Sequence, residues 1–385
     1  MIKVFDFLID NPTDFSEAVQ QLETTQVGSK VTFYNQVDDI KDFDFVVICV
    51  DESRGNPDNN TSIDFEHIKY AFYELQLGNW EISILDLGVI KPGNEISDTF
   101  YALRQVVNFA LEHHTLPIIL GGSQDILYSQ YRAYDGVKYM INIANIDFKF
   151  DLGDSNATLN HESYLSHMVV NKPYNLFNYA NIGYQTFYNT QEEIHLLDKM
   201  FFEAYRLGDI VNDIKIVEPV LRDADIAALD VRCIESQSVL QDEMQPNGFN
   251  NREICGLSRY AGLSDKVSSF GIYELQYLHS QTSKKLLGQI LWYFVEGTQY
   301  RLKEIADVNN PNFIKYQVPV DNETLIFYES QVSRRWWIEI PSNLNNVNNK
   351  LKQHTLLPCD KENYLSACNQ ELPERWLKAK QKNEF

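Results

Sequence analysis

Ionisable residues follow four apolar, β-branched runs of the sequence, and residues of these types perform acid–base chemistry or bind metals. The segments are Gly121-Gly-Ser-Gln-Asp125, Asp147-Phe-Lys-Phe-Asp151, Leu229-Asp-Val-Arg232 and Tyr273-Glu274. In an open parallel sheet the binding crevice lies beyond the carboxyl ends of the strands. The four segments therefore predict one cluster of polar side chains at a sheet edge.

The spacing within two of these segments predicts which side chains meet. Alternate residues of an extended segment point the same way, so Asp147, Lys149 and Asp151 share one face, as do Asp230 and Arg232. Buried acids need partners. We expect Lys149 and Arg232 to be those partners, so that three carboxylates and two cations give a cluster of net charge −1.

The elements that position these residues alternate along the chain. Strands are predicted at 45–50, 82–86, 116–120, 139–147, 180–184, 226–231 and 268–274. Helices are predicted at 64–76, 97–114, 123–134, 190–207, 250–263 and 281–306. This alternation is typical of a doubly wound, mainly parallel sheet between two helical layers. We expect one α/β domain of three α/β/α layers over residues 1–306.

The character of the sequence changes after residue 306. Two strand-like runs, 324–329 and 336–340, predict a hairpin, and a last helix is predicted at 361–382. We expect residues 307–385 to pack on the main domain as an extension that does not fold independently. Arg334-Arg-Trp-Trp337 is a cluster of cations and aromatic rings that favours packing of this extension over ligand binding.

Composition excludes several classes of function. Hydrophobic residues make up 44% and charged residues 23% of 385 residues, as in an ordinary globular protein. A formal charge of −21 repels nucleic acid and anionic membranes, so neither is an expected partner. Five scattered cysteines without a CxxC pair favour a reducing compartment, and no apolar run is long enough to span a bilayer. We expect a cytoplasmic protein and leave its oligomeric state open.

The strand-end motifs resemble those of the arginase and ureohydrolase family, formimidoylglutamase-like members above all. The resemblance is best over residues 246–264, which lead into Ser268-Ser-Phe-Gly-Ile-Tyr-Glu274, and it includes Leu291-Trp-Tyr-Phe-Val-Glu-Gly297. It implies the arginase-like three-layer α/β/α fold. It also implies a two-manganese centre that hydrolyses amidino groups.

Three of the six metal-ligand positions that the resemblance implies have changed. The family's Gly-Gly-Asp-His-Ser histidine is Gln124, and its Asp-Ala-His-x-Asp histidine is Lys149. The second aspartate of its Ser-x-Asp-x-Asp-x-x-Asp-Pro motif is Arg232. An ammonium or guanidinium group has no lone pair to give a metal near neutral pH. We therefore expect no manganese. Binding of a single metal remains an alternative, with residual ligands Asp147, Asp151 and Asp230.

The resemblance implies two further candidates for catalysis, both weak. Glu274 matches a family glutamate that binds or orients the amidino group, although Gln276-Tyr277 replaces the Asn-Pro that usually follows it. His161 falls near a family histidine used in proton transfer. The loop Asp51–Asp58 resembles the family's rim loop and is equally well interpreted as a turn.

The sequence thus predicts a formimidoylglutamase-like pseudoenzyme that has lost its metal centre and keeps a binding function. The expected partner is a small amidino or amino-acid ligand, or a protein. The alternative is an active hydrolase of linear amidines, such as N-formimino-L-glutamate or a guanidino compound, so enzyme status stays open. A nucleotide-binding protein is disfavoured because GxGxxG and P-loop motifs are missing. A serine or cysteine hydrolase is disfavoured because GxSxG is missing and Cys233 has no histidine nearby in sequence.

Overall fold

The computed structural model describes residues 4–36, 40, 42–58, 61–137, 140–240, 244–304, 306–341 and 356–384. A ten-stranded sheet forms the centre of this part of the chain. The strand order is β1-β4-β3-β5-β10-β9-β6-β7-β8, and β2 also pairs with β4. β1 is antiparallel to β4, and the other pairs are parallel. The strands are β1 Leu8–Ile9, β2 Val31–Phe33, β3 Phe45–Val50, β4 Ile84–Ile90, β5 Leu116–Gly121, β6 Ile141–Ile146, β7 Leu176–Tyr184, β8 Glu203–Arg206, β9 Ile226–Asp230 and β10 Ser269–Tyr273.

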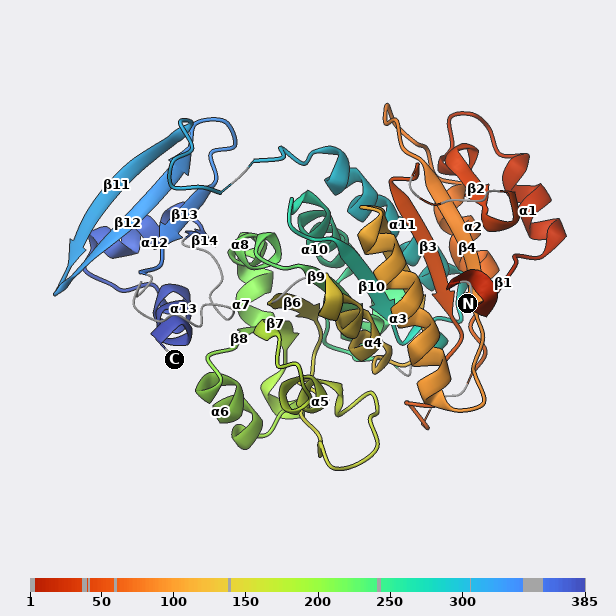
Figure 1. Cartoon of the computed structure of the whole chain (residues 1–385), viewed down its shortest axis with the longest axis horizontal. Coiled ribbons are helices and arrows are strands. Elements are labelled where there is room, and N and C mark those ends of the chain that lie inside the picture. The colour runs from red at the N-terminus through yellow and green to blue at the C-terminus, as the bar shows by residue number, and fades with distance from the viewer. Residues whose placement is uncertain are drawn as a thin grey trace.

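Helices cover both faces of this sheet (Figure 1). The α-helices are α1 Thr13–Gln20, α2 Phe65–Tyr73, α3 Ile96–Glu112, α4 Ile126–Arg132, α5 Tyr164–Val170, α6 Gln191–Lys199, α7 Leu207–Asn212, α8 Glu218–Arg222, α9 Ser236–Val239, α10 Asn251–Leu263 and α11 Gln281–Gln299. One apolar core joins the sheet to α2, α10 and α11, and a second joins its other face to α3, α4 and α5. Strands buried on both faces are continuous apolar runs, as β3 and β5 are here. The predicted three-layer fold with a mainly parallel sheet is confirmed.

Most predicted elements lie within a few residues of the observed ones, and one is wrong. The helix expected at 190–207 ends at Lys199, and the chain then forms β8. β8 is short and mixed in polarity, and it exists because it pairs with β7 at the sheet edge. The helix expected at 281–306 ends at Gln299. Residue 139, the expected start of one strand, and residue 305 lie outside the described residues.

The C-terminal part forms an antiparallel sheet of its own, seen apart from the main sheet at the left of Figure 1. Its order is β11-β12-β13-β14, with bounds Phe313–Val320, Glu323–Ser330, Trp336–Glu339 and Leu356–Cys359. The predicted hairpin is β12–β13, which pairs antiparallel, whereas β11 and β14 were not predicted. The single helix expected at 361–382 is two helices, α12 Lys361–Cys368 and α13 Glu374–Glu384. Pro373 separates them, because the residue before a proline avoids the helical conformation.

Ion pairs and hydrogen bonds join this C-terminal sheet to the main sheet. Arg375 of α13 pairs with Glu203 of β8 at 2.6 Å. Arg222 of α8 donates to the carbonyl oxygens of Trp336 and Cys359, and its guanidinium lies 4.7 Å from the ring centre of Trp337. Both tryptophans of the sequence cluster 334–337 are thus buried in packing. Among the described residues, no helix is long and apolar enough to cross a membrane.

The topology places the four predicted segments next to one another. β5, β10, β9 and β6 are consecutive neighbours, and they run parallel. Their carboxyl ends therefore lie along one stretch of the same sheet edge. Segments 121–125, 274, 230–232 and 147–151 follow these strands in that spatial order.

Candidate functional site

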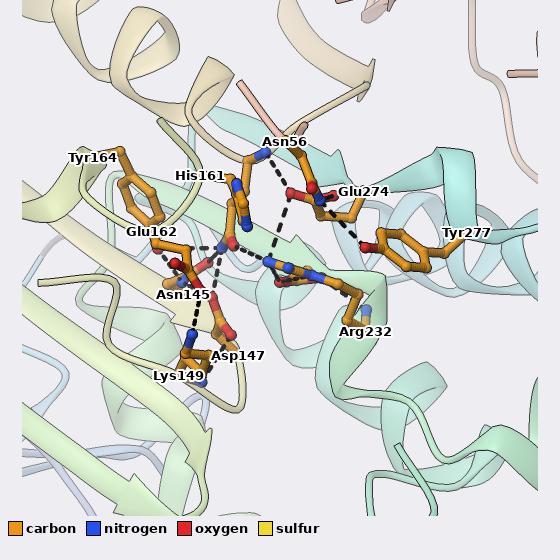
Figure 2. Close-up of polar contacts among 12 residues, drawn as sticks. Asn56, Asn145, Asp147, Lys149, His161, Glu162, Tyr164, Arg232, Glu274 and Tyr277 are labelled. Carbon is orange, nitrogen blue, oxygen red and sulfur yellow. Dashed lines mark hydrogen bonds and ion pairs between the residues drawn. The ribbon is translucent and has the colours of Figure 1, made fainter. Parts of the chain in front are cut away.

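Arg232 is the centre of the buried polar cluster at this edge (Figure 2). After β9 the chain turns into a 3-10 helix, Val231–Cys233, which brings the Arg232 side chain back over Asp230. Its Nη2 and Nε atoms lie 2.6 and 2.9 Å from Asp230 Oδ2, and Nη2 lies 3.6 Å from Glu274 Oε1. Burial opposes the charge of Arg232, but the carboxylates of Asp230 and Glu274 outweigh it and raise the guanidinium pKa.

Gln124 connects Arg232 to the next carboxylate along the edge. Its Nε2 donates to Asp147 Oδ2 at 2.6 Å, and its Oε1 accepts from Arg232 Nη2 at 3.4 Å. Its backbone N–H donates to Glu274 Oε1 at 3.0 Å. Gln124 is fully buried, so an amide with both a donor and an acceptor joins a carboxylate to a guanidinium.

Asp147 is fully buried, and protein donors bind both of its oxygens. Oδ1 accepts from the backbone N–H of Lys149, and Oδ2 accepts from Gln124 and from Asn145 Nδ2 at 2.9 Å. Asn145 also donates to the hydroxyls of Tyr164 and Tyr179. Burial, followed by the charge of Asp230, raises the pKa of Asp147 to about 7.

Asp151 differs from the other acids because neither of its oxygens has a hydrogen-bond partner among the described residues. It is 3% exposed, and its φ of 54° lies in the left-handed region, which is rare for an aspartate. Burial, then the charge of Asp147, raises its pKa well above the usual range. A buried unsatisfied carboxylate in a strained backbone is a common mark of a functional site.

Lys149 does not form the expected ion pair with the aspartates. Its ammonium group pairs with Glu162 (Figure 2). The Glu162 side chain is 55% exposed. The prediction assumed an extended chain from 147 to 151, but β6 ends at Ile146 and Asp151 has a positive φ. The alternation of faces therefore breaks down, and Lys149 points to the rim of the cluster.

Glu274 and Asn56 close the opposite side of the cluster. Asn56 Nδ2 donates to Glu274 Oε2 at 2.7 Å and lies 3.4 Å from the hydroxyl of Tyr277. Glu274 is fully buried and has a φ of 64°, the second strained acid of this edge. Burial is the main cause of its raised pKa, and Arg232 counteracts it.

His161 lies beside the cluster and is 6% exposed. Its Nδ1 lies 2.8 Å from the carbonyl oxygen of Gly55. A carbonyl only accepts hydrogen bonds, so the neutral ring carries its proton on Nδ1 and has an acceptor at Nε2. Figure 2 shows the ring turned toward Arg232 and Glu274.

The loop 51–58 packs directly against the cluster, because Asn56 donates to Glu274 and the carbonyl oxygen of Gly55 contacts His161. A Cβ on Gly55 would lie 2.0 Å from Asp125 Oδ2, so only glycine permits this contact. Asp125 is fully buried, and burial raises its pKa to about 7. Glu52 is also fully buried, and it pairs with Arg54 and accepts from the hydroxyl of Thr99.

Several residues of the cluster were not predicted. Asn145 precedes Asp147 by two residues and so shares its side of the strand, a signal that was available in the sequence. Asn56 lies in the loop 51–58, for which the sequence predicts a turn or a rim loop but no contact with Glu274. Tyr164 and Tyr179 gave no signal, because a tyrosine in an apolar run is typical of core packing.

The comparisons with known proteins bear on this geometry. The model of the arginase family matches residues 57–231, which hold the segments 121–125 and 147–151 and end one residue before Arg232. Residues 57–231 are an arginase-family segment. No curated protein matches the chain in sequence at a significant level.

Solved structures agree with the arginase-family fold. Formimidoylglutamase of Bacillus subtilis has a TM-score of 0.63 and 17% identity over 72% of this chain and 93% of its own. Formiminoglutamase of Trypanosoma cruzi, solved with Mn²⁺, has a TM-score of 0.61 and 15% identity over 69% of this chain and 96% of its own. Agmatine ureohydrolase of Thermoplasma volcanium has a TM-score of 0.55 and 15% identity over 74% of this chain and 98% of its own. At these identities the likeness establishes the fold alone.

A cavity of about 630 Å³ lies near the carboxyl end of β7 and shares no lining residue with the cluster. Gln185 lies in its wall, and the backbone N–H of Gln185 donates to the carbonyl oxygen of Phe148, whose ring lies 5.6 Å from the Arg232 guanidinium. Arg206 and Asp209 also line this cavity. The cavity therefore holds side chains of both charges, and Gln185 connects its wall to the segment 147–151.

Proposed function

We propose that this arginase-family protein is a binding protein without a dimanganese centre, in which Arg232 fills the place of the metals. The observation that carries the proposal is the pairing of Arg232 with Asp230 and its contact with Glu274. A guanidinium already neutralises these carboxylates. A dication at the same place would face a fixed positive charge.

The donor set of the cluster does not fit a two-metal centre. Both oxygens of Asp230 accept from Arg232, and both oxygens of Asp147 accept from protein N–H groups. Over the described ranges, no three His, Cys, Asp or Glu side chains are arranged to hold a metal ion. Among the described acids of the cluster, Asp151 has two oxygens without partners and the neighbouring Asp125 has one, and these do not form the multi-ligand shell that manganese prefers.

The ligand of this proposal is a small amino acid or an amidino compound bound in the 630 Å³ cavity. Arg206 is exposed there and would bind a carboxylate, whereas Asp209 and Glu235 would bind an ammonium or amidinium group. A protein partner or a second copy of the chain remains part of the proposal. We assign the function to the cytoplasm, which agrees with five cysteines present as free thiols.

One observation favours hydrolysis of a linear amidine as the second candidate. The Nε2 acceptor of His161 faces a cluster that also holds the unpartnered Asp151. Hydrolysis needs an activated water, which a metal usually supplies by lowering the pKa of the water bound to it. His161 alone would have to act as the base toward a substrate that is stable in water.

Turnover measurements separate the two candidates. We expect no formamide or urea release above background from N-formimino-L-glutamate, arginine or agmatine, with or without added Mn²⁺. A formimidoylglutamase assayed in parallel is the positive control. Manganese-dependent release that His161→Ala abolishes would contradict the binding function and establish the hydrolase.

A further inference from the structure

A second cavity, of about 290 Å³, lies between α3 and α4 and shares no lining residue with the cluster. Phe100, Tyr101 and Arg104 line it within little more than one turn of α3, and Tyr128 and Arg132 line it one turn apart on α4. Residues spaced by three and four positions lie on one face of a helix. The two helices thus present two cations and three aromatic rings to the same small volume.

The two cations of this cavity are not fully neutralised. Arg104 Nη2 and Arg132 Nη2 lie 3.2 and 2.8 Å from the same oxygen, Oδ2 of Asp135. Two guanidinium groups against one carboxylate leave an excess positive charge in a chain whose formal charge is −21. Each guanidinium also has N–H donors in a planar fork that the single shared oxygen does not occupy.

Aromatic rings flank the arginines. The guanidinium carbon of Arg132 lies 6.0 Å from the ring centre of Tyr128, within reach of a cation–π contact. Tyr101 is 52% exposed, so part of its ring is accessible to a ligand. A flat apolar group between Tyr101 and Tyr128 would bury their rings while its charged end contacts the arginines.

We propose that this cavity binds a small organic oxyanion, a carboxylate or phosphate attached to a flat apolar body. Arginine forks match the geometry of both anions. The volume lies near the lower limit of ligand cavities, roughly 300 Å³, so the ligand is a small molecule. A polyanion such as nucleic acid is disfavoured, because the net charge of the whole chain would repel it.

Helix α4, which lines this cavity, directly follows the strand-end segment that contains Gln124. Ser129 of α4 donates to the carbonyl oxygen of Phe100, which joins the two helices. α4 begins at Ile126, two residues after Gln124. A ligand that holds α3 against α4 should therefore slow amide exchange over residues 121–132, whether or not the proposed function of the cluster is right.

Calorimetric titration with phenyl phosphate and benzoate tests the proposal. We expect at least one of them to bind. Inorganic phosphate and phenol should bind at least tenfold more weakly, because inorganic phosphate lacks the flat apolar body and phenol lacks the oxyanion. Arg104→Gln should weaken the binding at least tenfold. Arg259→Gln is the matched control, since Arg259 is also a helical arginine near a tyrosine ring and pairs with Glu296 outside the cavity.

The arms of the titration have distinct outcomes. If phenyl phosphate alone binds, the ligand of the cavity is a phosphate ester. If benzoate alone binds, the ligand is a carboxylate. Equal affinity in Arg104→Gln and the wild-type protein would overturn the proposal, as would no binding of either probe. Arg104 is 43% exposed in its side chain, so this variant is expected to fold even where Arg132→Gln does not.

Discussion

At the scale of single residues, Arg232 and Lys149 differ although both replace expected metal ligands. The side chain of Arg232 is 11% exposed, and that of Lys149 is 28% exposed with a partner that is half in solvent. Removing one partner of a buried ion pair leaves an uncompensated charge, whereas an exposed pair contributes little. The two cations should therefore respond differently to the same substitution.

Arg232→Met is expected to lower the free energy of unfolding by about 3–5 kcal/mol, because Asp230 loses its buried counter-charge. Lys149→Met should lower it by less than about 1 kcal/mol. Urea titrations of both variants at one pH measure these values. A loss below about 1 kcal/mol in Arg232→Met would show that the cluster is solvated and would contradict its description as a buried network.

The ionisation of Asp125 should contribute to the pH dependence of the free energy of unfolding. Its pKa of about 7 in the folded state lies above the ordinary aspartate value of 3.8, so ionisation between these values disfavours the folded state. Stability is therefore fully present below pH 4 and is lost as the pH rises toward 7, by at most ~1.4 kcal/mol per pH unit for one group. Asp125→Asn should reduce this slope in urea titrations from pH 4 to 8. An unchanged slope would refute the assignment.

At the same scale, sequence reasoning located the cluster but not its internal contacts. The strand-end rule brought Gln124, Asp147, Asp230 and Glu274 to one edge correctly. The alternation of faces failed for Lys149, because a two-residue period holds only while the chain stays extended. The pairing of Arg232 with Asp230 depends on a 3-10 turn, which no local sequence pattern predicts.

At the scale of elements, apolar runs predicted the central strands because burial on both faces demands continuous apolar sequence. β3 matches its predicted bounds, 45–50. β8, Glu-Ala-Tyr-Arg, was missed because pairing at the sheet edge and cover from α13 stabilise it, and both are tertiary effects. α13 therefore matters to the main sheet as well as to its own.

Arg375→Met should loosen α13 from β8. It removes the partner of Glu203, whose side chain is 9% exposed, and this buried pair predicts a loss of about 3–5 kcal/mol. Lys380→Met, on the same helix with a more exposed partner, Glu323, should cost less than about 1 kcal/mol. Amide exchange over residues 203–206 should accelerate in the first variant alone. Similar exchange in both variants would mean that α13 does not hold the edge strand.

At the scale of the whole molecule, an arginase-like sheet carries Gln124, Lys149 and Arg232 at the three positions where the sequence resemblance implies other metal ligands. If this sheet edge has kept its geometry, the triple variant Gln124→His, Lys149→His and Arg232→Asp offers six metal donors. It should be less stable without metal, and Mn²⁺ should raise its melting temperature. A ligand at 100 times its dissociation constant stabilises the folded state by about 2.7 kcal/mol. A folded triple variant whose melting temperature does not change with Mn²⁺ would contradict the expectation that the sheet edge has kept the geometry of a metal site.

The metal content of the wild-type protein tests the central claim most directly. The chain is produced in medium supplemented with manganese, desalted, and analysed by inductively coupled plasma mass spectrometry alongside the triple variant. The pairing of Arg232 with Asp230 and its contact with Glu274 predict far less than one manganese ion per wild-type chain. One or two ions per wild-type chain would contradict the account, because Arg232 would then have to leave the carboxylates it contacts.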